Sequence, residues 1–285
     1  MFCSSLKLFD VSGRDVAWNG TMWVAVGGSG SSGDNTIAYS YDGINWTPAT
    51  NSIGIFSHYG QAVAWNGNMW VAVGGLDITS NKIVYSYDGI NWTPATDSSS
   101  IFANYGYGVA WNGTMWVAVG GYDPDTPRIV YSYDGINWTP VNGANTIFSV
   151  NGYSVAWNGN MWVAVGDGTN KIVYSYDGIN WEPVIDSSSI FSATGRDVAW
   201  NGTMWIAVGG SSGNKIVISY DGIKWYSNNS NLFTNGYGVA FSDSETTIKL
   251  NQKTNFSSEL EIVSETYSDR NINKMVISVV SEEEK

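Results

Sequence analysis

Six side chains of types that are common on binding surfaces recur in one sequence context of this 285-residue chain. Each stands two residues before a Val-Ala pair, and together they are Arg14, Gln61, Tyr107, Tyr153, Arg196 and Tyr237. Arginine and tyrosine are strongly enriched at interaction hot spots, and two guanidinium groups can hold one anionic group through paired hydrogen bonds. These six residues are therefore the candidate binding residues. The open alternative is that they only fill and satisfy the mouth of a channel.

Few residues are available for other chemistry. Cys3 and His58 are the single cysteine and the single histidine, so a disulfide within the chain, a cysteine-based zinc site and a histidine cluster all lack material. Asp123, Asp125 and Asp167 lie in Asp-rich turns, but they do not reach the ligand count of a dedicated calcium loop. The glycine-rich segment 27–33 lacks the following helix that a phosphate-binding loop requires. We expect no metal and no cofactor.

The charge of the chain restricts its partners. The net charge is -12 at pH 7, with 13 Lys and Arg residues against 25 Asp and Glu. Nucleic-acid binding needs a basic surface, so we expect no nucleic-acid partner. The first residues, MFCSSLKLFD, lack the apolar core of a signal peptide, and no apolar run reaches membrane-spanning length. These features predict no membrane insertion and a reducing, cytosol-like location.

The candidate residues belong to a repeated unit. Its first tryptophans are Trp18, Trp65, Trp111, Trp157 and Trp200, at spacings of 47, 46, 46 and 43 residues. Each is followed by Asn-Gly, by Met-Trp-(Val/Ile)-Ala-Val-Gly, by a variable loop and by the box Ser-Tyr-Asp-Gly. Three tryptophans in each of five units account for all 15 in the chain. We therefore interpret the tryptophans as repeat core rather than as a ligand platform.

Each unit carries the signals of four short strands. In the first unit these are residues 15–18, 22–26, 37–41 and a strand that begins at 46, with an Asn-Gly hairpin signal between the first two. The second strand is apolar on both faces, so both must be covered. Stacked blades around an axis supply that cover, and 40–45 residues is a propeller period. The variable loops then share one end of the molecule, and the Asn-Gly turns and boxes share the other.

A sixth unit can be assembled from both ends of the chain. Residues 236–241 repeat the first strand, residues 246–250 can serve as the second, and 273–278 match the third strand of the fifth unit. Leu8-Phe9 stands nine residues before Trp18, as Ile190-Phe191 does before Trp200. We predict an all-β, six-bladed propeller of four-stranded blades with essentially no helix. Its blades span 10–56, 57–102, 103–148, 149–191, 192–233 and 234–285, the last completed by 2–9 because an unpaired edge invites aggregation.

The box SYDGINW, present in four copies with a fifth reading SYDGIKW, resembles the Asp-box or bacterial neuraminidase repeat of sialidase-like propellers, although it is one residue shorter between Asp and Trp. The resemblance implies that the box is structural, with the Asp bonding turn amides and the Trp packing into the blade. The residues concerned are Asp42, Asp88, Asp134, Asp177, Asp221, Trp46, Trp92, Trp138, Trp181 and Trp225. The repeats also resemble, more loosely, those of large DNA viruses of amoebae, which adds a virion-associated location as an alternative.

Three hypotheses for function remain. The first is a non-enzymatic scaffold that binds a protein or glycan on the variable-loop face. The second is a sialidase-like glycoside hydrolase, for which the resemblance implies three arginines, a tyrosine nucleophile helped by a glutamate, and an aspartic acid. Arg14 and Arg196, each followed by aspartate, supply only two arginines, and no glutamate precedes Glu182, so we expect no enzyme. The third is a structural component of a larger particle. By strand alternation, Asp15 and Asp197 should point into their own blades.

Overall fold

The computed structural model describes residues 8–9, 12–28, 33–77, 79–121, 126–143, 146–210, 216–227 and 235–240. Within them the chain forms five antiparallel sheets of four strands each. The first sheet consists of β1 (Ser12–Trp18), β2 (Trp23–Gly28), β3 (Ile37–Ser40) and β4 (Thr47–Pro48). The second consists of β5 (Gly60–Trp65), β6 (Trp70–Gly74), β7 (Ile83–Ser86) and β8 (Thr93–Pro94).

The other three sheets repeat this order along the chain. The third consists of β9 (Gly106–Trp111), β10 (Trp116–Gly120), β11 (Ile129–Ser132) and β12 (Thr139–Pro140). The fourth consists of β13 (Gly152–Trp157), β14 (Trp162–Gly166), β15 (Ile172–Ser175) and β16 (Glu182–Pro183). The fifth consists of β17 (Gly195–Trp200), β18 (Trp205–Gly209), β19 (Ile216–Ser219) and β20 (Tyr226–Ser227).

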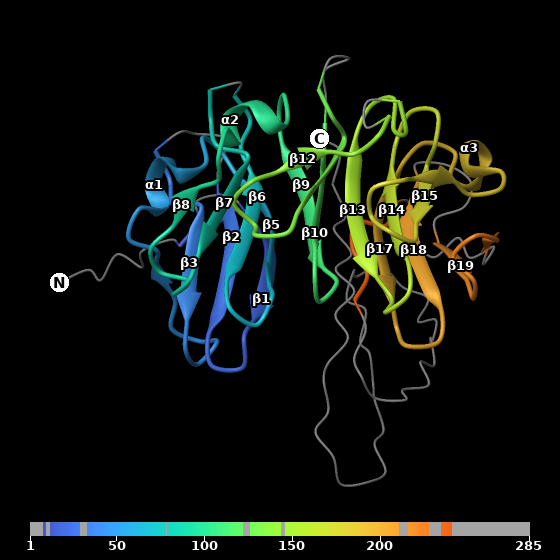
Figure 1. Ribbon diagram of the computed structural model, residues 1–285. Coiled ribbons are helices and arrows are strands. Elements are labelled where there is room, and N and C mark those ends of the chain that lie inside the picture. Colours follow the sequence, from blue (N-terminus) through green and yellow to red (C-terminus); the bar gives the residue numbers. More distant parts are fainter. Residues whose placement is uncertain are drawn as a thin grey trace, which may run out of the picture.

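The first strand of each sheet contacts the first strand of the next, in the order β1, β5, β9, β13, β17. These inner strands lie toward the middle of Figure 1, while β3 and β19 lie at its sides. Repeated four-stranded sheets stacked in this way form a propeller-like fold, as the sequence predicts. The five described sheets do not form a closed ring.

In the part of the chain that the structure describes, helix is confined to three single turns, a small departure from the expected absence of helix. They are α1 (Ser52–Ile55), α2 (Ser98–Ile101) and α3 (Ser187–Ile190). Each follows the fourth strand of a sheet and begins with a serine that accepts hydrogen bonds from the start of the third strand. In α2, the Ser98 hydroxyl accepts from the Lys82 and Ile83 amides at 3.0 Å each. The turns therefore fasten each connecting loop to its own sheet. None of the helices in the described segments has the length and apolar content needed to cross a membrane.

The Asn-Gly hairpins form as predicted, but with longer turns. Trp18 pairs with Trp23, so four residues rather than two lie in the turn. The Asn19 side chain accepts hydrogen bonds from the Thr21 and Met22 amides at 2.9 and 2.7 Å. Gly20 has a φ of 101°, which a residue with a side chain rarely adopts. The same asparagine bonds recur at Asn66, Asn112, Asn158 and Asn201.

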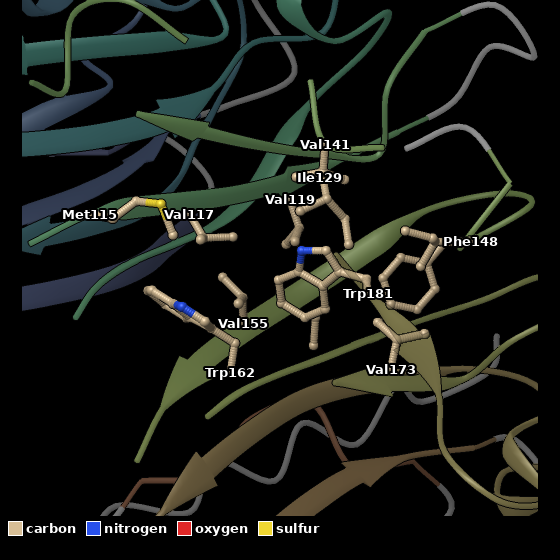
Figure 2. Close-up of a cluster of buried hydrophobic side chains, with 12 residues drawn as sticks. Met115, Val117, Val119, Ile129, Val141, Phe148, Val155, Trp162, Val173 and Trp181 are labelled. Atoms are coloured by element: carbon tan, nitrogen blue, oxygen red, sulfur yellow. The ribbon is translucent and has the colours of Figure 1, made fainter. Parts of the chain in front are cut away.

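The second strands of the three middle sheets, β6, β10 and β14, bury both faces, one against each neighbouring sheet, as the pattern of apolar residues predicts. Between the third and fourth sheets, Met115, which directly precedes β10, and Val117 and Val119 of β10 share one cluster with Trp162 of β14 (Figure 2). The box tryptophan Trp181 completes this cluster. Equivalent clusters lie between the other adjacent pairs of sheets. The sequence repeat therefore reflects a repeated interface between sheets.

Among the described residues, the first sheet packs against the second sheet on one face, and no sheet covers its other face. Val16 and Trp18 of β1 are 49 and 42% exposed, whereas the equivalent Val63 of β5 is 5% exposed. Phe9 lies against Gly27, as Phe56 lies against Gly74, which supports the alignment of Leu8-Phe9 with the end of a preceding unit. Most of the predicted sixth blade, including residues 2–7, 251–272, 273–280 and 281–285, lies outside the described residues. Its described part, residues 235–240, lies beside the fifth sheet, where the Gly236 amide donates to Gly209 O at 3.3 Å.

Candidate functional site

The candidate binding residues occupy one special backbone position. In β1, Gly13 pairs with Gly27 and Asp15 pairs with Val26, so Arg14 is an extra residue in a β-bulge. The same irregularity makes extra residues of Gln61, Tyr107, Tyr153 and Arg196 in the other inner strands. A bulge re-aims side chains and is over-represented next to functional sites. Sequence reasoning found these positions without predicting the bulge that defines them.

Four of the six candidates lie in one continuous row of rings and charge. The Tyr107 and Tyr153 rings are 4.9 Å apart between centroids. The Arg196 guanidinium lies 5.5 Å from the centre of the Tyr153 ring and 5.2 Å from that of Tyr237. Two tyrosines therefore flank one guanidinium, a geometry in which the ring faces attract the cation.

The row is extended by two tyrosines that sequence reasoning missed. Tyr105 lies 5.3 Å from Tyr107, and the Arg14 guanidinium lies 4.6 Å from the centre of the Tyr59 ring. Tyr59 and Tyr105 each precede the glycine that opens an inner strand, and this shared position was the signal available in the sequence. Gln61 holds the corresponding bulge position on β5, but it adds neither a ring nor a charge. The aromatic belt is the name used below for Arg14, Tyr59, Tyr105, Tyr107, Tyr153, Arg196 and Tyr237.

Two tyrosines of the belt, Tyr107 and Tyr153, are partly buried, and the hydroxyl of Tyr153 is held by a hydrogen bond. Burial raises the pKa of the Tyr107 and Tyr153 hydroxyls above its usual range, so both stay protonated as hydrogen-bond donors. The Tyr153 hydroxyl accepts a hydrogen bond from the Asn151 side-chain amide at 2.9 Å and faces Asp167 Oδ2 at 3.5 Å. Within the described residues, Arg196 Nε is buried and has no hydrogen-bond partner. The indole nitrogens of Trp70, Trp116, Trp162 and Trp205 share this property, but Arg196 alone among these side chains carries a charge that an acceptor would offset.

Asp15 and Asp197 do not point into their own blades, so that expectation is wrong. Asp15 accepts a hydrogen bond from the Val63 amide of β5 at 2.9 Å, and Asp197 accepts from the Val239 amide at 2.8 Å. The bulge is the physical reason, because it breaks the two-residue alternation just before each aspartate. Each carboxylate joins its inner strand to the inner strand of the following unit.

Burial raises the pKa of both carboxyl groups, that of Asp15 to about 6, and hydrogen bonds from backbone amides only partly oppose the rise. The charge of Asp197 contributes a smaller increase to the pKa of Asp15. Asp15 also keeps exposed surface, so hydration offsets part of its rise. These two acids are the titratable groups nearest in sequence to the belt arginines.

The five boxes share the hydrogen bonds from backbone amides to the aspartate, and four of them add a bond from an asparagine side chain that Lys224 replaces in the fifth. In the third unit, Asp134 Oδ1 accepts from the Ile136 and Asn137 amides at 2.8 and 2.7 Å, and Oδ2 accepts from the Asn137 side chain at 2.8 Å. Ser132 bonds both Asp134 and the Gly135 amide. The Trp138 indole donates to Gly135 O at 3.0 Å. Asp42, Asp88, Asp177 and Asp221 accept the equivalent amide bonds.

The set of residues that a sialidase-like reaction needs is not assembled among the described residues. Arg128 is buried and donates to the carbonyl oxygens of Thr126 and Val150, while Arg270 lies outside the described residues. Glu182 is on the outer strand β16, where it accepts a hydrogen bond from the Tyr174 hydroxyl at 2.8 Å. Within the same residues, no three histidine, cysteine or acidic side chains group closely enough to hold a metal ion.

Comparison with known proteins identifies the fold alone. The sequence matches no protein-family model and has no significant match among curated proteins. An ancestral GH74 enzyme superposes with a TM-score of 0.59 at 18% identity, covering 85% of this chain and 35% of that one. The GH74 enzyme of Niastella koreensis gives a TM-score of 0.52 at 18% identity, with coverages of 80% and 34%. A chain of a nidogen–laminin complex gives 0.56 at 13% identity, with coverages of 79% and 83%.

This chain spans about a third of the length of the two GH74 enzymes. Identities this low support the propeller-like arrangement of repeated sheets, and fold likeness does not fix an activity.

Proposed function

We propose that this protein is a non-enzymatic propeller scaffold that binds a protein or glycan partner through the aromatic belt and the variable loops beside it. The observation that carries the proposal is the repeated bulge. Five inner strands place one extra side chain each at the same level, and its type changes from unit to unit. A constant backbone that presents varied side chains is the way that binding surfaces are built.

The chemistry of the belt favours a partner that presents a carboxylate. Arg196 lies between two tyrosine rings and has a buried Nε without a partner. A carboxylate oxygen would satisfy that donor in a charge-assisted hydrogen bond. The protonated Tyr107 hydroxyl adds a donor, and the Tyr107 and Tyr153 rings add flat apolar faces. An acidic side chain of a protein and the carboxylate of a sugar both fit this description.

A sialidase-like hydrolase is the alternative that one observation favours. Asp15 and Asp197 form a pair of acids with raised pKa, and catalytic acids often have raised pKa values. Against this, Asp15 accepts two backbone amides, while Asp197 accepts two amides and the Ser154 hydroxyl. Carboxylates committed to structural donors are poor candidates for proton transfer to a substrate, and this favours binding over catalysis.

We also propose that the ring has six units, the last built from residues 234–285 and closed by residues 2–9. Val16 and Trp18 are exposed, and Phe9 lies against Gly27. Both observations support a further unit that packs against this side of the first sheet. Removing residues 1–9 should lower the free energy of unfolding by several kcal/mol, about 1.5–3 for each buried apolar side chain lost. An unchanged urea midpoint would contradict the closure.

The test uses two probes that carry carboxylates, a glutamate-rich peptide and sialyllactose, titrated by calorimetry against the full chain. Arg196→Ala should weaken binding of the responding probe by about 2 kcal/mol or more, as at other hot spots. Gln61→Ala occupies the same bulge position without ring or charge and is the matched control. Equal binding by wild type and the Arg14→Ala, Arg196→Ala double variant would remove the belt from the site.

The two alternatives give different results in the same assays. Turnover of a fluorogenic sialoside that disappears in Arg196→Ala would establish the hydrolase. If neither probe bound to the wild-type chain, the purely structural role would be favoured.

A further inference from the structure

A groove of about 330 Å³ lies away from the belt, on the outer side of the molecule. One wall is α2 with the residues before it, Thr96, Asp97, Ser100 and Ile101. The other wall is the outer part of the third sheet and its box, with Pro127, Val130, Asn137, Trp138 and Pro140. The belt is formed by inner strands, whereas this groove is bordered by the outer strands β11 and β12. It is therefore a separate site.

At the equivalent place between the first and second sheets, the box tryptophan Trp92 is buried and Asn51 bonds its backbone. There Asn51 donates from its amide to Trp92 O at 2.6 Å and accepts from the Trp92 amide at 3.3 Å. Trp92 is 3% exposed. Asp97 takes the place of Asn51 in the next repeat. A carboxylate cannot donate to a carbonyl oxygen, and accordingly this link is absent and Trp138 is only half-buried.

Asp97 has a left-handed backbone conformation, and its own side chain forms no hydrogen bond that stabilises it. Its φ is 52°, in the left-handed region, and its side chain makes no cap hydrogen bond to α2. In the described part of the chain, only Asp186 shares this property among residues other than glycine. A residue in this region usually costs some stability, and such residues cluster at ligand-binding sites. The Asp97 carboxylate has no hydrogen-bond or ion-pair partner among the described residues, and it borders the groove.

The groove presents acceptors around one aromatic face. The Asn137 amide nitrogen donates to Asp134, which leaves its carbonyl oxygen as an acceptor. The Trp138 indole N–H donates inward to Gly135 O, so the ring offers apolar surface rather than a donor. Ile101, Val130 and two prolines supply the remaining apolar lining. The groove therefore suits a small ligand with an apolar face and several hydroxyl donors.

We propose that this groove binds a neutral pyranose sugar, with its C–H face against Trp138 and its hydroxyls donating to Asp97 and Asn137. The volume is at the lower end of the range for small-molecule sites, which limits the site to one or two sugar rings. An organic cation would use the carboxylate as well, but cation recognition by stacking favours several rings around the charge, and the groove contains only Trp138. This site is independent of the partner proposed for the belt.

The experiment follows the indole N–H resonance of Trp138 in a ¹⁵N-labelled full-length chain, assigned by Trp138→Phe. Glucose, galactose, mannose and N-acetylglucosamine are titrated one at a time, with lysine and choline as cationic probes. At least one sugar should shift this resonance saturably. Asp97→Gly removes the carboxylate in a conformation that glycine adopts freely, and Asp97→Asn replaces it with the residue that stands at this position in the preceding repeat. Each variant should weaken sugar binding by about tenfold or more.

The matched control is Asp186→Asn, because Asp186 precedes the same Ser-Ser-Ser-Ile turn and has the same backbone conformation. It should leave the Trp138 response unchanged. Unaltered backbone amide spectra show that the Asp97 variants keep their fold. The proposal is overturned if no sugar shifts the Trp138 resonance, if only lysine or choline shifts it, or if both Asp97 variants bind as the wild type does.

Discussion

The box aspartates and the two aspartates at the belt end, Asp15 and Asp197, respond to their surroundings in opposite directions. At the box end, burial alone would raise the pKa of Asp88, Asp134 and Asp177, but hydrogen bonds from backbone and side-chain amides outweigh it and hold each pKa at about 2. At the belt end, burial outweighs the amide bonds and raises the pKa of Asp15 to about 6. The box aspartates lie in exposed turns, whereas Asp15 and Asp197 lie between inner strands.

This difference indicates that the box end of the molecule is structural, whereas the side chains of the belt end can vary to suit a binding partner. The boxes repeat the same backbone-amide bonds in five units because each must turn the chain and seal an interface between sheets. At the belt end the backbone bulge repeats, while the side chain that it presents is arginine, glutamine or tyrosine. Substitutions at the box end should therefore change stability, and substitutions of belt side chains should change binding.

The largest expected effect at the box end is the loss of a buried tryptophan. Trp92 is 3% exposed and belongs to the core between the first and second sheets. Trp92→Ala should lower the free energy of unfolding by about 3–5 kcal/mol through the cavity that it leaves. Trp46→Ala is the matched control, and its half-buried ring should give a clearly smaller loss. Equal losses in urea denaturation would show that the box tryptophans do not owe their effect to burial.

The next effect comes from a glycine that is needed for two reasons. Gly89 has a φ of 72°, and a Cβ there would meet the end of the Met22 side chain and lie 3.1 Å from both Trp70 Nε1 and Val24 Cγ2. Gly89→Ala should cost about 2–4 kcal/mol, through backbone strain together with overpacking. Gly67→Ala has a φ of 97° with open space around its Cβ, so only the strain should remain. Thermal denaturation of both variants separates the two contributions.

The sequence predicted the parts of the fold that each unit specifies locally. Five Asn-Gly hairpins, a second strand apolar on both faces and a box that bonds its own amides all follow from residues within one unit. The bulge was not predictable, because register depends on the pairing of Gly13 and Asp15 with the neighbouring strand. Tyr59 was missed since its contact with Arg14 joins residues from different units. The groove beside Trp138 depends on the exchange of Asn51 for Asp97 in a contact between units.

A smaller effect is expected from removing one box carboxylate. Asp134 is exposed, so water can replace it at the Ile136 and Asn137 amides. Asp134→Ala should therefore cost only about 1 kcal/mol, near the net value of ordinary hydrogen bonds. Asp134→Asn keeps one acceptor oxygen and should cost less. The urea midpoint measures both, and a change in binding of the belt probes without a change in stability would break the division between the two ends.

The smallest effect is a dependence of stability on pH that has opposite slopes for the two ends. Between pH about 2 and 4 the unfolded chain binds more protons than the box aspartates do when folded, so the free energy of unfolding should rise with pH. Between pH about 4 and 6 the folded chain holds a proton on Asp15 that the unfolded chain has lost, so the free energy should fall as pH rises. The exposed surface of Asp15 keeps this fall modest.

Asp15→Asn should reduce the fall in the upper part of this profile and leave the lower part intact, whereas Asp134→Asn should remove only the share of one of the five box aspartates from the rise in the lower part. Urea denaturation at half-unit pH intervals measures both profiles. If Asp15→Asn left the slope between pH about 4 and 6 unchanged, burial would not control this carboxyl group, and the contrast between the two ends would have to rest on hydrogen bonding alone.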